Sequence, residues 1–220
     1  MGTADRLLQL APDVSDHIHN RLVTLNRLGD AEQALGDARA AVGTFREMVR
    51  TGSRLLDIDD RNVAWAGDLA VALERLGTAQ EAAADLPGAL KSHRESLALR
   101  EWLVGQDDAN PDWYRNLAIS YERVATVLAQ TGDMQTALSH QEASLAMMRD
   151  LAASYPDDLW YKLDLVRALD LTAVLLEDPT AENREALAIL EEMQANGTLP
   201  PGYEDWIAGF RRNLGLPTEF

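Results

Sequence analysis

Cysteine is absent from the 220-residue chain. Its absence excludes disulfide scaffolds, cysteine-ligated zinc, iron–sulfur clusters and thiol nucleophiles. No stretch approaches the ~18–20 uninterrupted apolar residues that a membrane span needs. The segment Met1–Pro12 lacks the basic start and the long apolar run of a signal peptide. The sequence therefore predicts a cytoplasmic protein that does not associate with membranes.

Positive charge is scarce, and lysine is nearly missing. The chain carries 20 Lys and Arg against 36 Asp and Glu, a formal net charge of −16, and its only lysines are Lys91 and Lys162. Such a surface repels nucleic acids and anionic membranes, and it favours basic or neutral protein partners. The preference for arginine over lysine indicates a GC-rich bacterial genome. With 46% hydrophobic and 25% charged residues, the composition is that of a folded globular protein.

Recognisable catalytic and metal-binding motifs are also missing. His17 and His19 are two residues apart on an expected helix, so they point in different directions and do not share a metal easily. There is no Gly-x-Ser-x-Gly elbow, no glycine-rich phosphate loop and no EF-hand spacing. The acidic stretches at 57–60 and 107–108 are interpreted as helix caps. We expect a protein without enzymatic activity, cofactor or metal.

What the chain does have is an internal repeat. Trp65 and Trp113 are 48 residues apart, and Trp160 follows 47 residues later. The 48-residue shift also places Arg27-Leu28-Gly29 on Arg75-Leu76-Gly77, and it keeps the same register at several other separated places. Such a period is the mark of a repeat architecture.

Each repeat predicts a pair of helices. The spacing of Trp113, Leu117, Tyr121, Val124 and Leu128 puts these side chains on one face of a helix. Gly132-Asp133 is a short turn, so the helix that follows must pack antiparallel. Helices are expected at 13–35, 38–58, 62–83, 86–106, 111–131, 134–155, 158–177, 181–196 and 202–214, and no strand is expected.

These positions resemble the tetratricopeptide repeat (TPR) in its long-helix bacterial variety. The third unit fills the motif slots of that family with Tyr121, Val124, Ala125, Gly132-Asp133, Ala137-Leu138 and Ser144. The unit is 48 residues long instead of 34. The expected aromatic residue of the second helix is present as Phe45, but His93 and Gln141 replace it in later units.

The resemblance implies an all-α, right-handed superhelical solenoid of about four antiparallel helix pairs with a C-terminal capping helix. We expect a single domain over 1–220. Its units would cover 13–60, 61–108, 109–156 and 157–198, after a partial repeat at 3–11 and before a cap at 199–220. Trp206, Phe210 and Leu214 share the apolar face of that cap. The partial repeat suggests a C-terminal part of a larger bacterial signalling protein; a natural short N-terminal helix is the alternative.

The resemblance also implies that the first helix of each pair lines a concave face that binds a peptide or a partner protein. Equivalent exposed positions would then stack from unit to unit as polar ladders. The predicted contact residues are Asn26, Arg27, Glu74, Arg75, Thr78, Arg115, Glu122, Arg123 and Thr126. The same residues fit a structural role as clamps between repeats, with Glu74 and Glu122 compensating the neighbouring arginines.

Two other functions remain open. An apolar face made by Leu7, Leu8, Leu22 and Leu25 would support a homodimeric scaffold. Alternatively, the array would regulate an effector enzyme whose catalytic domain lies outside this chain. The periodic tryptophans Trp65, Trp113 and Trp160 are expected in the core between units, whereas Trp102 breaks the period and is expected to be partly exposed.

Overall fold

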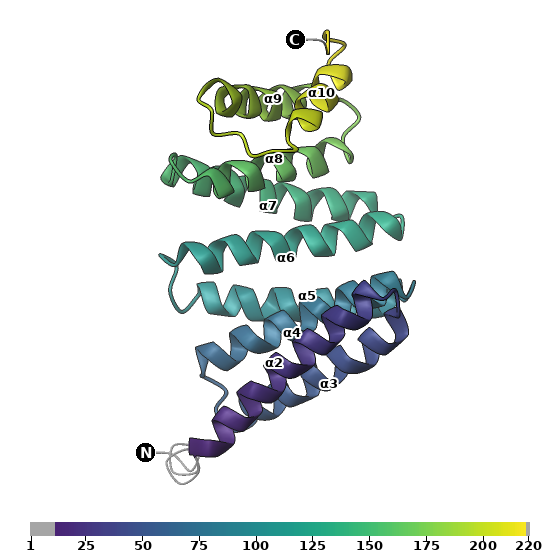
Figure 1. Cartoon of the computed structure of the whole chain (residues 1–220), viewed down its shortest axis with the longest axis vertical. Coiled ribbons are helices and arrows are strands. Elements are labelled where there is room, and N and C mark those ends of the chain that lie inside the picture. Colours follow the sequence, from purple (N-terminus) through teal and green to yellow (C-terminus); the bar gives the residue numbers. More distant parts are fainter. Residues whose placement is uncertain (1–11, 219–220) are drawn as a thin grey trace. The chain divides into compact units, whose positions relative to one another are not determined.

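The computed structural model describes residues 12–218, and all regular secondary structure in this range is α-helical (Figure 1). The helices are α2 (Pro12–Ala34), α3 (Ala38–Leu56), α4 (Val63–Ala82), α5 (Leu86–Val104), α6 (Pro111–Gln130), α7 (Met134–Ser154), α8 (Leu159–Ala173), α9 (Thr180–Ala195) and α10 (Glu204–Asn213). Two consecutive helices form each pair, so α2, α4, α6 and α8 are the first helices and α3, α5, α7 and α9 the second helices.

The helices match the ranges expected from the sequence, with one clear difference. Helix α8 was expected over 158–177 but ends at Ala173. Pro179 disfavours helical backbone at the residue before it, and the segment after Val174 forms turns instead. The expected partial repeat at 3–11 lies outside the described residues.

Aspartate side chains cap the N-termini of three of the second helices. Asp37, Asp85 and Asp133 each accept a hydrogen bond from a backbone N–H three residues ahead. This is the usual N-terminal cap of a helix, which satisfies one of its free donors.

Two of the loops between repeats use asparagine instead, with Asn62 and Asn110 capping α4 and α6, whereas Asp158 caps α8. The acidic stretches at 57–60 and 107–108, interpreted as helix caps, therefore do not cap the helices that follow them. Within these stretches, Asp57 is the C-terminal cap residue of α3.

The chain divides into two compact units, Met1–Trp113 and Tyr114–Phe220. In the first unit, each helix from α2 to α5 packs against the next along the chain. Its core gathers apolar side chains of α2, α3 and α4 around the fully buried ring of Phe45. Leu22 and Leu25 belong to this core, so their expected exposure is wrong, whereas Leu7 and Leu8 of the expected dimer face lie outside the described residues.

In the second unit, α7, α8, α9 and α10 also pack in sequence. Its core includes residues of α6 as well, such as Ala118. Helix α10 buries Ile207 and Phe210, while Trp206 and Leu214 pack against the same cluster. This arrangement confirms the expected C-terminal capping helix.

The tryptophans differ from expectation at one position. Trp65 is buried, Trp102 and Trp113 are half-buried, and Trp160 is 69% exposed. Tyr161 is buried instead, and its ring lies 5.4 Å from that of Tyr155. Tyr161 is 48 residues after Trp113, whereas Trp160 is 47 after it, so the tyrosine keeps the register of the repeat. The prediction that Trp160 is a core residue is wrong for this reason.

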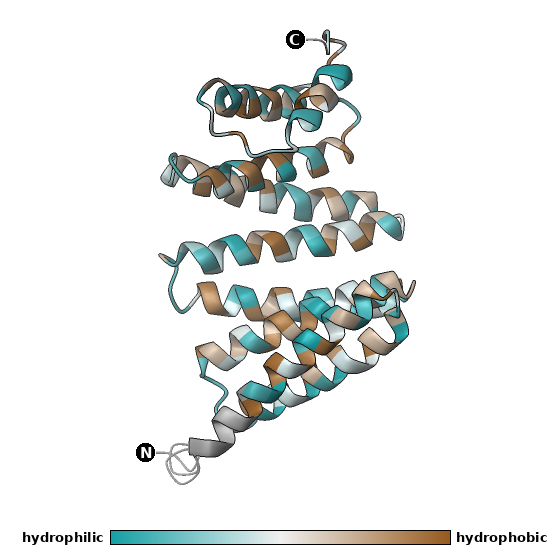
Figure 2. Ribbon diagram, in the orientation of Figure 1, coloured by the Kyte–Doolittle hydropathy of each residue, from teal (hydrophilic) through white to brown (hydrophobic). Residues whose placement is uncertain are grey.

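Hydrophobic and hydrophilic residues are interspersed along the helices (Figure 2). Among the described helices, none combines the length and the apolar character required to cross a bilayer.

Candidate functional site

The candidate site residues of the first unit lie on α2 and α4 and are partly engaged within the protein. Arg100 Nη2, on α5, donates to Glu74 Oε2 at 2.5 Å. Burial lowers the pKa of Arg100, and Glu74 partly opposes that shift. Arg75 instead pairs with Asp30 of α2, with 3.1 Å between Nη1 and Oδ1. The expectation that Glu74 compensates Arg75 is therefore wrong.

Three other candidates in this unit differ in their surroundings. Arg27 is exposed and forms no ion pair with any described residue. Asn26 Oδ1 is buried without a hydrogen-bond partner in the described structure. The Thr78 hydroxyl donates to the backbone oxygen of Glu74 one turn earlier. Arg27 and the half-exposed Arg75 therefore offer the accessible charged groups of this set.

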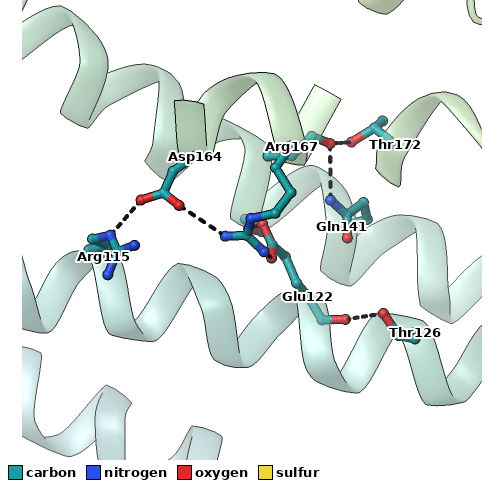
Figure 3. Close-up of polar contacts among 9 residues, drawn as sticks. Arg115, Glu122, Thr126, Gln141, Asp164, Arg167 and Thr172 are labelled. Atoms are coloured by element: carbon teal, nitrogen blue, oxygen red, sulfur yellow. Dashed lines mark hydrogen bonds and ion pairs between the residues drawn. The ribbon is translucent and has the colours of Figure 1, made fainter. Parts of the chain in front are cut away.

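In the second unit, an alternating chain of charges joins α6 to α8 (Figure 3). Arg115 Nε donates to Asp164 Oδ2 at 2.5 Å, and Arg167 Nη2 donates to Asp164 Oδ1 at 3.3 Å. Arg167 Nη1 also donates to Glu122 Oε2. Two first helices of consecutive repeats are thereby linked through two arginines and two carboxylates, an arrangement that supports a clamp between repeats.

Glu122 is the most enclosed member of this chain, at 2% exposure. Its other carboxylate oxygen accepts a hydrogen bond of 3.3 Å from the Ser144 hydroxyl. Burial raises the pKa of Glu122, while the positive charge of Arg167 acts in the opposite direction. The expectation that Glu122 compensates Arg123 is wrong, because its carboxylate faces Arg167 and Ser144.

Arg123 and Thr126 remain on the accessible surface of α6. Arg123 is exposed and pairs with no carboxylate of the described chain. The Thr126 hydroxyl donates to the backbone oxygen of Glu122 at 2.9 Å. With Gln130, these residues recur at three and four positions along one helical face.

An open apolar pocket of about 190 Å³ lies between α6 and α8. Thr126 is one of its walls, and Val174, just after α8, is another. The pocket is lined by Ala125, Thr126, Ala129, Gln130, Gln141, Leu171, Val174 and Leu175. The sequence contained one signal for it, since Gln141 of α7 replaces the aromatic residue expected at this place in the repeat.

Among the residues whose side chains the structure describes, no group of three or more His, Cys, Asp or Glu is placed to hold a metal ion. The buried His93 lies with Nε2 2.8 Å from Glu81 Oε1. His140 donates from Nδ1 to the backbone oxygen of Thr136. Both histidines are therefore engaged in local contacts within their own repeats.

Comparisons with known proteins relate the chain by fold and not by sequence. No protein-family model matches it. No curated protein has significant sequence similarity to it. Among solved structures, it is similar to BtubC (BKLC) from P. vanneervenii, with a TM-score of 0.68 and 15% identity over 97% of this chain and 78% of that one.

Two further similarities are weaker. A putative kinesin light chain with TPR-like repeats from Podosopora anserina has a TM-score of 0.47 and 16% identity, over 89% of this chain and 95% of that one. A thermophilic TPR protein of Thermus thermophilus has a TM-score of 0.44 and 20% identity, over 90% and 83%. The likeness to the first of these structures and the consecutive helix pairs give the chain an all-α, TPR-like fold.

Proposed function

We propose that this chain is a non-catalytic protein-interaction module that binds a peptide or a partner protein on its first-helix face. TPR-like folds commonly mediate protein–protein interaction. In the TPR resemblance, the first helices line the concave side of the array. The proposed contacts are accessible polar groups such as Arg27 and Arg123, together with apolar pockets between the first helices.

The observation that carries this proposal is the open pocket between α6 and α8. An apolar hollow beside exposed polar side chains is the usual form of a peptide-binding groove, in which the hollow anchors one side chain and polar groups fix the orientation. Arg123 adds an unpaired guanidinium on α6, whose planar donors suit carboxylates and peptide carbonyls. The buried and paired Glu122 supports the groove from inside and is not among the proposed contacts.

A capture experiment with matched baits tests the proposal. The baits are the unaltered chain, Arg123→Glu on the first helix α6, and Arg94→Glu on the second helix α5. Both arginines are exposed, so the two variants change the charge equally and differ only in position. Proteins captured from a lysate of the source organism are identified by mass spectrometry.

We expect a set of partners that the unaltered and Arg94→Glu baits retain and the Arg123→Glu bait loses. The proposal fails if no partner depends on Arg123, or if both variants lose the same partners equally. A self-associating scaffold is not favoured, because Leu22 and Leu25 of the expected dimer face are core residues.

A further inference from the structure

Val174 stands between two hollows of the second unit. It is 76% exposed, just after the end of α8. On one side is the apolar pocket of about 190 Å³ described above. On the other is a second hollow of about 340 Å³, lined by Asp170, Ala173, Val174, Pro179, Asn183 and Asn213. The two hollows share Val174 as their common wall.

The first hollow suits an apolar side chain. Its walls are formed mainly by alanine, leucine and valine side chains. Two of its polar groups are already used, since the Thr126 hydroxyl donates to Glu122 and Gln141 Nε2 donates to Ala168 O. Because an apolar cavity of about 150 Å³ holds a benzene ring, this hollow has room for a leucine or phenylalanine side chain.

The second hollow is suited to a cation. Asp170 is half-buried, and its carboxylate takes part in no hydrogen bond or ion pair with the described residues. Burial raises the pKa of Asp170, and no positive charge of the described residues opposes that shift. The C-terminal end of α8 adds the negative end of a helix dipole beside it. The amides that line the hollow bond to each other, Asn213 Nδ2 donating to Asn183 Oδ1 at 3.1 Å.

The spacing of the two hollows constrains a ligand. Asp170 and Val174, a wall residue of the first hollow, are four residues apart on α8 and its cap, so their Cβ atoms are about 5–6 Å apart. A peptide covers this distance with side chains two apart in an extended segment, or three to four apart in a helix. A net charge of −16 further favours a basic segment.

We propose that the surface on either side of Val174 binds a protein segment that places an apolar side chain in the first hollow and a lysine or arginine side chain against Asp170. This subsite rests on the proposed function and names the chemistry of the partner. An apolar anchor supplies affinity, while the cation selects among apolar segments and fixes the direction in which the segment lies.

Random 12-residue peptides displayed on phage are the probe. They are selected on the full chain, and enriched sequences are synthesised and measured by fluorescence anisotropy. We expect the enriched peptides to share an apolar residue two to four positions from a lysine or arginine. Asp170→Asn should weaken their binding about tenfold, the loss expected for a hydrogen-bonded charge. Ala129→Leu, which fills the first hollow, should weaken it at least as much.

Glu142→Gln is the matched control, because it removes one exposed carboxylate from the second helix α7 and should leave binding unchanged. A cycle that combines Asp170→Asn with replacement of the basic peptide residue by glutamine isolates the pair. If Asp170 contacts the basic residue of the peptide, replacing that residue by glutamine weakens binding little once Asp170 has been changed to asparagine. Apart from Asp170→Asn, the cycle changes only the peptide, so it requires no further protein variant to fold.

The proposal is overturned if no peptide is enriched, if the enriched peptides lack a basic residue, or if the cycle shows independent effects. Failure here is distinguishable from failure of the proposed function. If the capture of lysate partners depends on Arg123 but Asp170→Asn does not affect peptide binding, only this subsite is wrong. The proposed interaction module is then still supported.

Discussion

Small residues at one position of each first helix decide how closely the two helices of a pair approach. A Cβ atom added at Gly29 would lie 2.4 Å from the Phe45 ring, and one at Gly77 would lie 2.5 Å from the His93 ring. Both rings are almost fully buried, so neither moves aside cheaply. The third unit combines Ala125 with the non-aromatic Gln141, and both of these side chains line the apolar pocket. The sizes of the side chains at these two positions thus decide whether the two helices pack closely or leave a pocket.

Gly77→Ala should destabilise the protein by about 1–3 kcal/mol, because the methyl group overlaps a buried ring. Gly67→Ala on the same helix is the control. It meets nothing within 4 Å and should stabilise the helix by about 0.5–1 kcal/mol. Urea unfolding monitored by circular dichroism measures both. Equal effects of the two substitutions would contradict the close approach at Gly77.

The raised pKa of Glu122 makes stability depend on pH. Between its ordinary value of 4.5 and the raised pKa, the folded protein keeps a proton on Glu122 that the unfolded chain has lost. The contribution of Glu122 to stability is therefore full below 4.5 and decreases as the pH rises through the raised pKa. Glu122→Gln removes this titration, so the stability of the unaltered protein relative to the variant should fall with rising pH.

Urea unfolding at a series of pH values checks this, with Glu142→Gln as the exposed control. A relative stability that rises with pH would mean that the ion pair with Arg167 outweighs the burial of Glu122.

At the scale of elements, the turns between paired helices repeat one backbone conformation with different residues. Gly36 and Gly132 have φ values of +77° and +89°, and Ala84 occupies the equivalent place with a φ of +59°. A left-handed conformation strains an alanine because of its Cβ atom. The turn of the second repeat therefore carries conformational strain, and the packing of the flanking helices must offset the free energy of that strain.

Ala84→Gly should stabilise the protein by about 0.5–1 kcal/mol by removing this strain. Its neighbour Ala83 has a φ of −84°, where alanine is unstrained. Ala83→Gly should destabilise by a similar amount through the added freedom of the unfolded chain. Thermal unfolding of the two variants side by side measures the opposite signs, and a common sign would refute the argument.

At the scale of the whole molecule, each compact unit has its own hydrophobic cluster. In repeat proteins, each element is stabilised chiefly by its neighbours along the chain. A change in one cluster should therefore act mainly on the helices that contribute to it.

Phe45→Ala should cost about 3–5 kcal/mol and lower the amide protection of α2–α4 more than that of α8–α10. Met193→Ala, in the core of the second unit, should give the reverse pattern. Hydrogen exchange read by mass spectrometry resolves the two. Equal loss of protection in all helices under either substitution would show that the chain unfolds as one cooperative body.

Local sequence patterns were enough to predict the all-helical fold, the pairing of helices and most of their bounds. These features depend on local chemistry: apolar residues at helical spacing, aspartate caps such as Asp133, and turn glycines such as Gly132. The 48-residue period then relates equivalent elements. The end of α8 was missed, because the apolar pattern of 174–176 continues beyond the point at which the backbone turns.

Which charges pair and where the surface is hollow depend on how the helices pack, and sequence patterns did not predict either feature. Glu74 and Glu122 are equivalent in the repeat, yet their partners lie 26 and 45 residues further along the chain. The position equivalent to Arg100 is Met148, so Glu122 takes its arginine from the next first helix. Such pairing, like the apolar pocket beside Thr126, depends on side chains that different helices bring together, and no spacing along a single helix specifies it.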